Sequence, residues 1–394
     1  MAYHSGSYQK GLLEGVHRLH FIGIGGSGMF PLVQILATKG YTITGSDVNE
    51  GSIIESERNM GIQVFMGHKA ENVLGADLVV YSAAIHGDNP EMQAAQAHGI
   101  RCVERSVMLG YVSRLYQNSI CVSGTHGKTT TTSMITTMLE LAGRDPAAVI
   151  GTGSEIVVEA CEFSETFLQL TPAISIILNI DNDHLDYYGT LGKLKFAFRR
   201  FALLTQHTVI ANLDDANTRD VVGGVDRPVR TFAINNPEAD YTAVNVKMYK
   251  PGFYEFDVLE WGDFFAHLRL GIPGRHHIYN ALAMCCCVRI LNLTPEDAAV
   301  AAEHFTGAAR RFQILGEVNG ATVVDDYAHH PTEVRATLET AKSLGYNQVW
   351  AVHQPFTYSR TKALMDDFVS ALEIADHVVI TPIMGSREVD DGSV

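Results

Sequence analysis

A glycine-rich loop at residues 124–130 carries the side chains that a triphosphate needs. It follows the apolar run 119–122 and opens the helical stretch 131–142. In such a loop, backbone N–H groups surround the phosphates, Lys128 reaches the outer phosphates and the Thr129 hydroxyl meets Mg²⁺. Val122 stands where the strict pattern has its first glycine, and a chance Gly-Lys-Thr is the alternative. The residues expected to bind ATP here are Gly124, Thr125, His126, Gly127, Lys128, Thr129 and Thr130.

A second glycine-rich loop lies upstream, at residues 23–28, and fits the pattern G-x-G-x-x-G. Asp47 follows about 20 residues on, where a dinucleotide site has a carboxylate for a ribose hydroxyl. Three interpretations remain: an NAD site, a tight turn without a ligand, or a site for another diphosphate such as a UDP-sugar. We favour the UDP-sugar because two phosphate loops suggest one nucleotide-linked substrate and one ATP.

The composition limits the class of protein. The chain has 394 residues with 44 acidic and 29 basic side chains, a net charge of -15, which disfavours nucleic acid as a partner. No segment approaches the about 18 consecutive apolar residues of a membrane helix, and residues 1–10 lack an apolar signal core. The six cysteines form no C-x-x-C pair and are expected to be reduced, mostly buried thiols. We expect a cytoplasmic monomer or homodimer without a membrane partner.

Short Val- and Ile-rich runs alternate with helical stretches, which is typical of parallel sheets covered on both faces. The alternation restarts twice, so we expect an α/β protein of three domains. These are a Rossmann-like domain at 1–115, a central P-loop ATPase-like domain at 116–312 and a Rossmann-like domain at 313–394. Expected strands are 20–24, 41–44, 77–81, 119–122, 322–324, 348–352 and 377–380, and expected helices include 31–38 and 131–142.

Several motifs in a fixed order resemble those of the Mur ligase family. Besides the two loops, they cover nearly the whole chain, and together they are specific although none is decisive alone. The matching segments are 45–47, 81–85, 158–162, 179–188, 273–276, 310–312, 325–331 and 354–361.

The resemblance implies a ligase that joins an amino acid to a UDP-linked muramic acid. ATP would phosphorylate the substrate carboxylate, and the amine would attack the acyl phosphate. Within the family, the motifs favour L-alanine, UDP-N-acetylmuramate and ATP as substrates. Tyr327 and the segment 185–188 modestly favour a single amino acid over a recycled tripeptide. An NAD-dependent oxidoreductase and a non-catalytic UDP-sugar binder stay open as alternatives.

The resemblance also implies a metal site at Thr129, Glu159 and His184. Mg²⁺ prefers oxygen ligands, and Mn²⁺ would suit the histidine better. His184 has an alternative, a strand-end histidine that is hydrogen-bonded to Asp183 or Asp186. Glu159 has one too, an acidic residue that merely closes a strand.

By resemblance, His276, Asn280, Arg311 and Asp326 contact ATP, with Asn280 at the adenine and Asp326 at the ribose. His277 stands where asparagine is usual, so we shift the adenine contact to Asn280. Because Asn280 precedes an apolar helical run, the alternative is a helix N-cap.

The catalytic set expected by resemblance is Lys128, His184, His329 and Arg360. Arg360 would grip the α-carboxylate of the incoming amino acid at two points, which lysine cannot do. The alternative for Arg360 is a solvated surface arginine. His329 would handle the amino acid or act as general base for its amine.

The UDP-substrate would lie on the first loop, with Asp47 and His68 as candidates for ribose and uracil. A plain surface histidine is the alternative for His68. The residues expected to bind this substrate are Gly25, Gly26, Ser27, Gly28, Asp47, His68, Ser82, Thr125 and His126.

Two departures from the family pattern stand out. The segment between Lys128 and Glu159 is short, and the sequence ends at Val394, before the last helix and strand of a third domain. We expect absent segments rather than true deletions, because a truncated sheet edge is costly for a working protein. The third domain is therefore expected to be incomplete.

Overall fold

The computed structural model describes residues 11–146, 153–385, 388–390, 392 and 394. They divide into two compact units. The first contains the described residues among 1–120, 145–158 and 165–173, and the second contains those among 121–144, 159–164 and 174–394. The three-domain division with boundaries near 115 and 312 stays a prediction.

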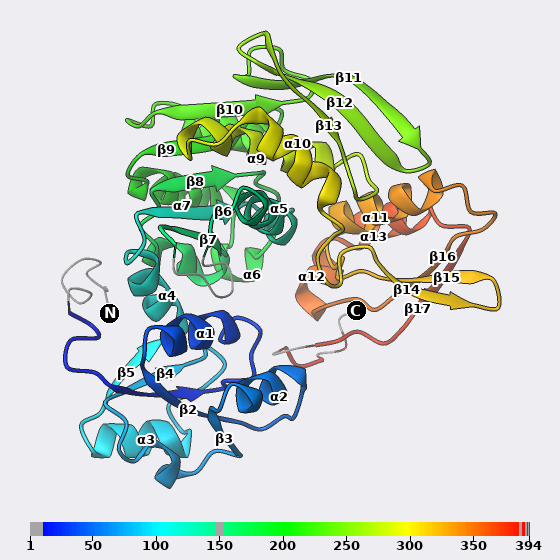
Figure 1. The fold of residues 1–394 in the computed structure, drawn as a ribbon. Helices are drawn as coiled ribbons and strands as arrows, with labels where there is room; N and C mark the ends of the chain where they lie inside the picture. Colours follow the sequence, from blue (N-terminus) through cyan, green and yellow to red (C-terminus); the bar gives the residue numbers. More distant parts are fainter. Residues whose placement is uncertain (1–10, 147–152, 386–387, 391, 393) are drawn as a thin grey trace. The chain divides into compact units, whose positions relative to one another are not determined.

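A five-stranded parallel sheet forms the centre of the first unit, in the order β3-β2-β1-β4-β5. Helices α1 and α3 lie on opposite faces of it (Figure 1). The strands are β1 (Arg18–Ile22), β2 (Thr42–Asp47), β3 (Gln63–Met66), β4 (Leu78–Tyr81) and β5 (Arg101–Glu104). The helices are α1 (Phe30–Thr38), α2 (Ser52–Asn59), the 3-10 helix η1 (Ala70–Val73), α3 (Pro90–Ala97) and α4 (Arg105–Ser113).

Both faces of the two middle strands of this sheet are buried, as expected for a parallel sheet. Phe21 and Ile22 of β1 and all of Leu78–Val80 in β4 have no exposed side-chain surface. Gly23 follows β1 with a φ of +79°, a left-handed conformation that glycine adopts without strain. The chain therefore turns sharply at the carboxyl ends of β1 and β2, where the first glycine-rich loop meets Asp47.

An eight-stranded sheet, in the order β13-β12-β11-β10-β9-β8-β6-β7, lies mainly in the second unit, although residues 118–120 of β6 and 155–158 of β7 are counted with the first. Its strands are β6 (Asn118–Ser123), β7 (Glu155–Glu159), β8 (Ile174–Ile177), β9 (Thr208–Asn212), β10 (Val229–Ala233), β11 (Tyr241–Lys250), β12 (Phe253–Glu260) and β13 (Asp263–Arg269). The helices that accompany it are α5 (Lys128–Leu141), η2 (Phe163–Gln169), α6 (Leu185–Tyr188), α7 (Leu191–Leu204), α8 (Ala216–Val222), α9 (His277–Ile290) and α10 (Pro295–His304).

The antiparallel part of this sheet differs from the purely parallel sheets that we expected. Strands β11, β12 and β13 are joined as two hairpins, whereas β8, β9 and β10 are parallel. Gly252 and Gly262 occupy the two turns with φ values of +76° and +87°. Tight turns of this kind need left-handed residues, so the glycines are the local cause of the hairpins.

The rest of the second unit forms two small sheets and three helices. Strands β14 (Gln313–Val318) and β15 (Ala321–Asp325) are antiparallel, whereas β16 (Trp350–His353) and β17 (His377–Ile380) are parallel. The helices are α11 (Pro331–Ser343), α12 (Tyr358–Ala363) and α13 (Met365–Leu372). A cluster of buried residues including Val334, Leu338 and Phe368 holds α11 and α13 together.

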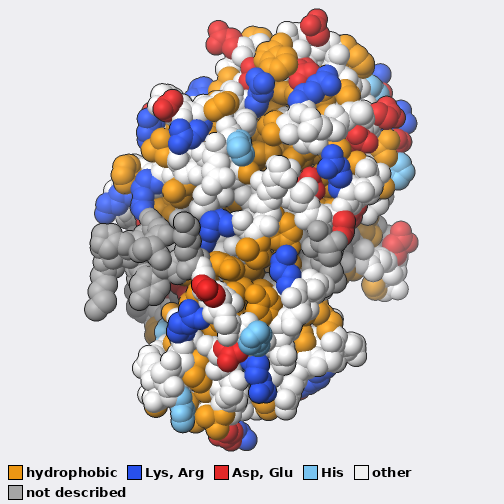
Figure 2. Space-filling view, turned by 60° about the vertical axis from the view of Figure 1, so that its left-hand side comes forward, with side chains coloured by type: hydrophobic (Ala, Val, Ile, Leu, Met, Phe, Trp, Pro, Cys, Tyr) orange, Lys and Arg blue, Asp and Glu red, His pale blue; other side chains and the backbone are white. Residues whose placement is uncertain are grey.

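The cysteines are reduced and mostly buried, as the sequence predicted, and charged side chains of both signs lie at the surface (Figure 2). Figure 2 shows Lys and Arg side chains interspersed with Asp and Glu on the face it displays. All six cysteines are free thiols, four of them buried. Within the described ranges, no helix combines the length and the apolar character that crossing a bilayer requires.

Candidate functional site

The second glycine-rich loop lies between β6 and α5. Gly124 and Gly127 have φ values of +135° and +87°. A methyl group on Gly124 would lie 3.0 Å from Leu178 Cβ, so only glycine lets the loop pass this close to the end of β8. The Asn179 side chain then holds the loop in place, because its Oδ1 accepts from His126 N at 2.8 Å and its Nδ2 donates to His126 O at 3.1 Å.

Lys128 begins α5 and folds back over the loop. Its Nζ donates to Thr125 O at 3.1 Å and forms an ion pair with Glu162 Oε2 at 3.0 Å. Burial acts to lower the pKa of Lys128, but the Glu162 carboxylate outweighs burial and raises it. The lysine is therefore charged and partly buried, with Glu162 as its counter-ion.

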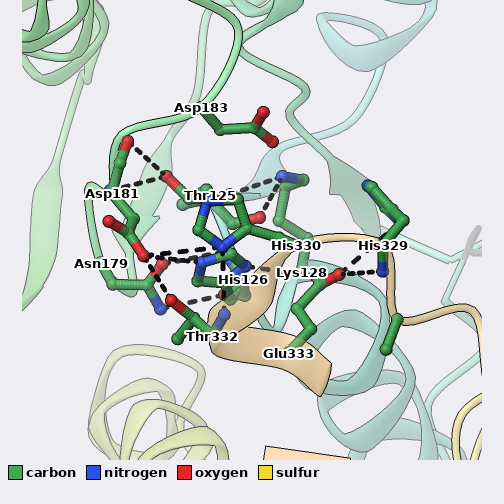
Figure 3. Close-up of polar contacts among 12 residues, drawn as sticks. Thr125, His126, Lys128, Asn179, Asp181, Asp183, His329, His330, Thr332 and Glu333 are labelled. Carbon is green, nitrogen blue, oxygen red and sulfur yellow. Dashed lines mark hydrogen bonds and ion pairs between the residues drawn. The ribbon is translucent and has the colours of Figure 1, made fainter. Parts of the chain in front are cut away.

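His126 is held between two carboxylates from distant parts of the chain. Its Nε2 lies 3.1 Å from Asp181 Oδ2, and its Nδ1 lies 3.2 Å from Glu333 Oε1 (Figure 3). Burial opposes the charge of the ring, but hydrogen bonds to Asp181 and Glu333 outweigh it and raise the pKa of His126 to about 9. The same contacts hold the pKa of both carboxyl groups well below the usual range.

A cavity of about 490 Å³ opens beside this loop, within the second unit. Its volume lies in the range of nucleotide and cofactor sites. The predicted ATP-binding residues that line it are His126, Gly127, Thr130, His276, Asn280, Arg311 and Asp326.

The α9 end of the cavity is formed by two histidines and Asn280. Asn280 lies inside α9, and His276 is the N-cap residue, so the N-cap alternative for Asn280 is wrong. Asn280 Nδ2 and His277 Nδ1 are 3.0 Å apart, and a methyl group on Gly127 would lie 2.8 Å from Asn280 Oδ1. Burial lowers the pKa of His276 to about 4 and that of His277 well below its usual value, so both rings are neutral. Neutral rings beside an amide suit an uncharged base.

Arg311 precedes β14 and Asp326 follows β15, and both side chains line the cavity. Arg311 Nη1 lies 3.9 Å from Glu333 Oε1. Asp326 accepts from Phe312 N and Ala328 N, both at 2.7 Å, and burial raises its pKa. Both Asp326 oxygens therefore already bind backbone amides, which limits what they can offer to a ribose.

The predicted metal ligands fall into two groups. Thr129 Oγ1 donates to Glu159 Oε2 at 3.1 Å. His184, which has a φ of +55°, instead faces Glu162 Oε1 at 3.8 Å and Asp183 Oδ2 at 3.7 Å. Burial lowers the pKa of His184, which favours the neutral form that binds a metal. The structure thus adds Glu162 to the oxygen atoms near the predicted site.

Arg360 is not a solvated surface arginine; that alternative is wrong. Its side chain is 11% exposed, and its Nε and Nη2 donate to Asp183 Oδ1 at 3.1 and 2.9 Å. Burial acts to raise the pKa of Asp183, but interactions with His184 and Arg360, hydrogen bonds included, outweigh it and lower the pKa to about 2. Within the described chain, Arg360 Nη1 is buried without a hydrogen-bond partner.

His329 lies in the segment that leads into α11, two residues before the helix begins. Its Nδ1 lies 2.8 Å from Tyr327 O, and its backbone N–H donates to Glu333 Oε2 at 3.1 Å. The side chain is about one quarter exposed. Figure 3 shows His329 on the opposite side of Glu333 from the His126 ring.

The first glycine-rich loop is built differently. Gly25 N donates to Asp47 Oδ2 at 3.0 Å, so the Asp47 carboxylate is turned onto the loop itself. A methyl group on Gly23 would lie 3.3 Å from Ser82 Cβ, and one on Gly28 would lie 3.3 Å from Arg105 Nη1. Arg105, the first residue of α4, is thus a cation at the loop that the sequence analysis missed.

His68 takes part in a buried network rather than standing alone at the surface. Its Nδ1 lies 3.1 Å from Ser46 Oγ and 3.0 Å from Glu91 Oε2, and its side chain is only 16% exposed. Glu91 is fully buried and also accepts from Asn72 Nδ2. The plain surface alternative for His68 is therefore wrong, and its role with UDP stays a prediction.

Most of the residues that sequence reasoning missed are acidic or amide partners of predicted ones. Glu162, Asn179, Asp181 and Asp183 lie within the motif segments 158–162 and 179–188, but only Asp183 had been named, as an alternative partner of His184. Glu333 lies just beyond the motif that ends at Pro331. A signal existed for four of them, because motif residues beside a predicted ligand are natural partners for it.

Known protein families match nearly the whole length of the chain, including both glycine-rich loops. Three family models match: "Mur ligase family, catalytic domain" at residues 18–117, "Mur ligase middle domain" at 122–288, and "Mur ligase, glutamate ligase domain" at 310–392.

The chain is 44% identical to the UDP-N-acetylmuramate–L-alanine ligase of Caldanaerobacter subterraneus, over 97% of this chain and 86% of that protein. It is 42% identical to the same-named ligase of Alkaliphilus metalliredigens, over 95% and 85%. The crystal structure of UDP-N-acetylmuramate-alanine ligase from Thermotoga maritima matches with a TM-score of 0.79 at 30% identity, over 94% of this chain and 86% of that one. These matches confirm the family and the α/β fold class expected from the sequence. The chain belongs to the Mur ligase family.

Proposed function

We propose that this protein joins L-alanine to UDP-N-acetylmuramate at the expense of ATP, by way of an acyl phosphate. The observation that carries the proposal is the 44% and 42% identity, over nearly the whole chain, to proteins named for this reaction. Those names do not favour an NAD-dependent oxidoreductase or addition of a recycled peptide. The cavity beside the second loop, lined by His126, Gly127 and Thr130, supports ATP binding independently of the names.

The chemical problem is to bring a carboxylate up to a γ-phosphate. Two anions repel each other strongly in a poorly screened site, so cations must surround them. Lys128 is the resident cation, and it is already charged because Glu162 lies 3.0 Å from its Nζ. When ATP enters, Lys128 exchanges the Glu162 carboxylate for a phosphate oxygen.

Thr129 and Glu159 fit a divalent cation because their oxygens already lie 3.1 Å apart at the start of α5. Oxygen ligands of this kind suit Mg²⁺, and His184 beside Glu162 would favour Mn²⁺ as a substitute. The ion would neutralise phosphate charge when bound.

The nucleoside would lie in the cavity between the second loop and α9. Asn280 is a candidate for the adenine because it lines the cavity, where its Nδ2 lies 3.0 Å from His277 Nδ1 and its Oδ1 lies close to Gly127. The neutral His276 and His277 rings line the same wall. Arg311 and Asp326 close the opposite side, where the ribose would lie.

The amino acid would be gripped by Arg360. Asp183 occupies the Nε and Nη2 hydrogens and leaves Nη1 buried and free for a carboxylate oxygen. A guanidinium fixed in this way holds the amino acid by its α-carboxylate, so that its amine lies at a set distance from the reacting carbonyl. This positioning lowers the barrier to reaction as well as improving binding. His329 would accept the amine's proton or leave it to solvent.

The UDP-substrate would be held by the first loop. Backbone N–H groups at Ser27 and Gly28 and the guanidinium of Arg105 suit a diphosphate, whereas Gly26 N already donates to Gly23 O at 3.3 Å. Asp47, His68 and Ser82 stay candidates for the sugar and the base.

Incorporation of labelled L-alanine tests the proposal. The purified chain is incubated with UDP-N-acetylmuramate, labelled L-alanine, Mg²⁺ and ATP, and product is separated chromatographically. Product is expected only with ATP, and glycine or serine should react about 10- to 200-fold less efficiently, the range that one methyl or hydroxyl group allows. Absence of any ATP-dependent product, or a preference for a tripeptide over L-alanine as the attacking amine, would overturn it.

A further inference from the structure

A second metal-ligand cluster lies beside the second loop and shares no residue with the predicted magnesium site. Its members are His126, Asp181 and His330, whose ligand atoms all lie within 4.8 Å of one another. They come from three segments: the loop before α5, the loop after β8 and the N-cap of α11 (Figure 3). Ligands that converge from distant segments are typical of a site built by the fold.

The spacing of these atoms fits a tetrahedral ion. Ligands about 2.0–2.1 Å from a zinc ion lie about 3.3 Å from one another in a tetrahedron. His126 Nε2 and Asp181 Oδ2 are 3.1 Å apart, and His330 Nδ1 and Asp181 Oδ2 are 3.9 Å apart. Small side-chain movements would therefore bring all three to bonding distance.

The surroundings of His126 match a histidine prepared for a metal. A metal-bound histidine usually donates its other ring N–H to a carboxylate, which fixes the tautomer and the orientation of the ring. The Nδ1 of His126 faces Glu333 Oε1 at 3.2 Å, which leaves Nε2 for the ion. Asp181 is likewise held, because Thr332 Oγ1 donates to its Oδ2 at 2.8 Å.

His330 gives a second and independent indication. It is only 4% exposed, and its Nε2 has no hydrogen-bond partner within the described chain. Its Nδ1 lies 3.9 Å from Asp181 Oδ2 and accepts a 3.3 Å hydrogen bond from Thr332 N, and an ion bound at Nδ1 would take that lone pair and break this weak bond. A buried imidazole satisfied so poorly suits a ligand more than a structural residue.

We propose that His126, Asp181 and His330 form a binding site for a transition-metal ion of the Zn²⁺ class. Two imidazoles and one carboxylate suit Zn²⁺ or Co²⁺ and disfavour Mg²⁺, which takes oxygen ligands. The ion replaces the proton between His126 Nε2 and Asp181 Oδ2, and that proton leaves to solvent. A fourth position faces the cavity, which His126, Asp181 and Glu333 line, so water completes the coordination.

The experiment titrates the purified chain with Co²⁺ or Zn²⁺ in Mg²⁺-containing buffer without nucleotide. We expect one equivalent to bind, with the visible absorption of tetrahedral Co²⁺. Zn²⁺ should also raise the melting temperature, because it binds the folded state only. His330→Asn should lower the affinity about 10- to 100-fold while keeping the N-cap, a position that asparagine favours.

Two matched variants make the test specific. His329→Asn makes the same change one residue away, and His184→Asn removes a predicted ligand of the magnesium site. Both should bind Co²⁺ as the unchanged protein does. Unaltered binding by His330→Asn, or loss of binding in His184→Asn, would overturn the proposal. If His330→Asn melts early without metal, Asp181→Asn replaces it, with the same loss expected.

Discussion

The two glycine-rich loops have similar sequences and positions, yet their surroundings differ. Uncharged side chains such as Ile54 and Ser82 lie close to the first loop, the Asp47 carboxylate accepts from Gly25 N, and the Arg105 guanidinium lies beside Gly28. Around the second loop, charged side chains are paired with one another. Lys128 is paired with Glu162, and His126 lies between Asp181 and Glu333.

This difference indicates two ways to hold phosphate. The first loop offers N–H groups and one guanidinium. Because the charges of Asp47 and Arg105 nearly balance, a bound diphosphate would make this site negative. The second loop keeps its cations permanently charged by giving them carboxylate partners, and phosphate then replaces a partner. The first arrangement suits a substrate that is held, and the second suits a phosphate that is transferred.

The largest effect is expected from Lys128→Met. Loss of the only lysine at the second loop should lower kcat about 10²- to 10³-fold, as removal of one charge-stabilising group does elsewhere. Product formation under saturating substrates measures it. Lys195→Met is the control. It removes a lysine of α7 that is paired with Asp220 of α8, and it should change kcat little. Comparable loss in both variants would mean that the comparison of the loops is wrong.

Arg105→Ala should damage the first loop alone. A charged hydrogen bond contributes about 1.5–3 kcal/mol, so the KM for the UDP-substrate should rise about 10- to 100-fold. The KM for ATP should stay the same. Arg101→Ala is the control, because this nearby arginine donates to Leu12 O and not to the loop. An unchanged KM for the UDP-substrate would remove Arg105 from the site.

Asp183→Asn tests whether the paired charges of the second unit also position groups. The asparagine keeps one acceptor for Arg360 but loses the charge, which is worth about 1 kcal/mol. We expect the KM for L-alanine to rise about three- to tenfold with little change in the KM for ATP. Discrimination between L-alanine and L-alaninamide should fall in parallel. Intact discrimination would show that Asp183 does not hold Arg360 for the carboxylate.

The last effect is on stability rather than on the reaction, and it concerns an unpaired carboxyl near the first loop. Glu57 in α2 is fully buried with no partner for either oxygen within the described chain, and burial together with the nearby Asp47 charge raises its pKa from 4.5 to about 8. The folded state thus holds a proton that the unfolded state loses above pH 4.5, so stability falls as pH rises towards 8.

Glu57→Gln cannot ionise and should lack this loss. Urea unfolding at pH 5 and pH 9 should give similar stabilities for the two proteins at pH 5. At pH 9 the variant should be more stable by about 1–3 kcal/mol, the cost of a poorly satisfied buried polar group. A difference that does not grow with pH would show that Glu57 is ionised and paired in solution.

Local patterns allowed much of the fold to be predicted. The strand expected at 377–380 is β17, and that at 119–122 lies inside β6 (Asn118–Ser123). The helix expected at 31–38 is α1 with one further residue. The hairpins of β11, β12 and β13 were missed, because their turn glycines lie in a region read only for the alternation of strands and helices.

The site was predictable one residue at a time but not pair by pair. Arg360 was expected to grip a carboxylate, yet nothing in the sequence shows that Asp183, 177 residues away, already holds it. A helix start at Asn280 was the alternative, but the helix starts about one turn earlier, at His277. Asn280 therefore lies in the helix interior. Periodicity and motifs report local geometry, whereas pairing depends on how distant segments pack.

The long-range contacts of the second loop have a consequence for how the protein matures. His126 meets Glu333 across 207 residues of chain, and Asp181 meets Thr332 across 151. Closing such loops costs chain entropy before any contact forms, so these pairs assemble late. The first loop has all its partners once Arg105 has left the ribosome. The second loop is complete in sequence by Thr130, but it receives its last counter-ion only after Glu333 has been synthesised.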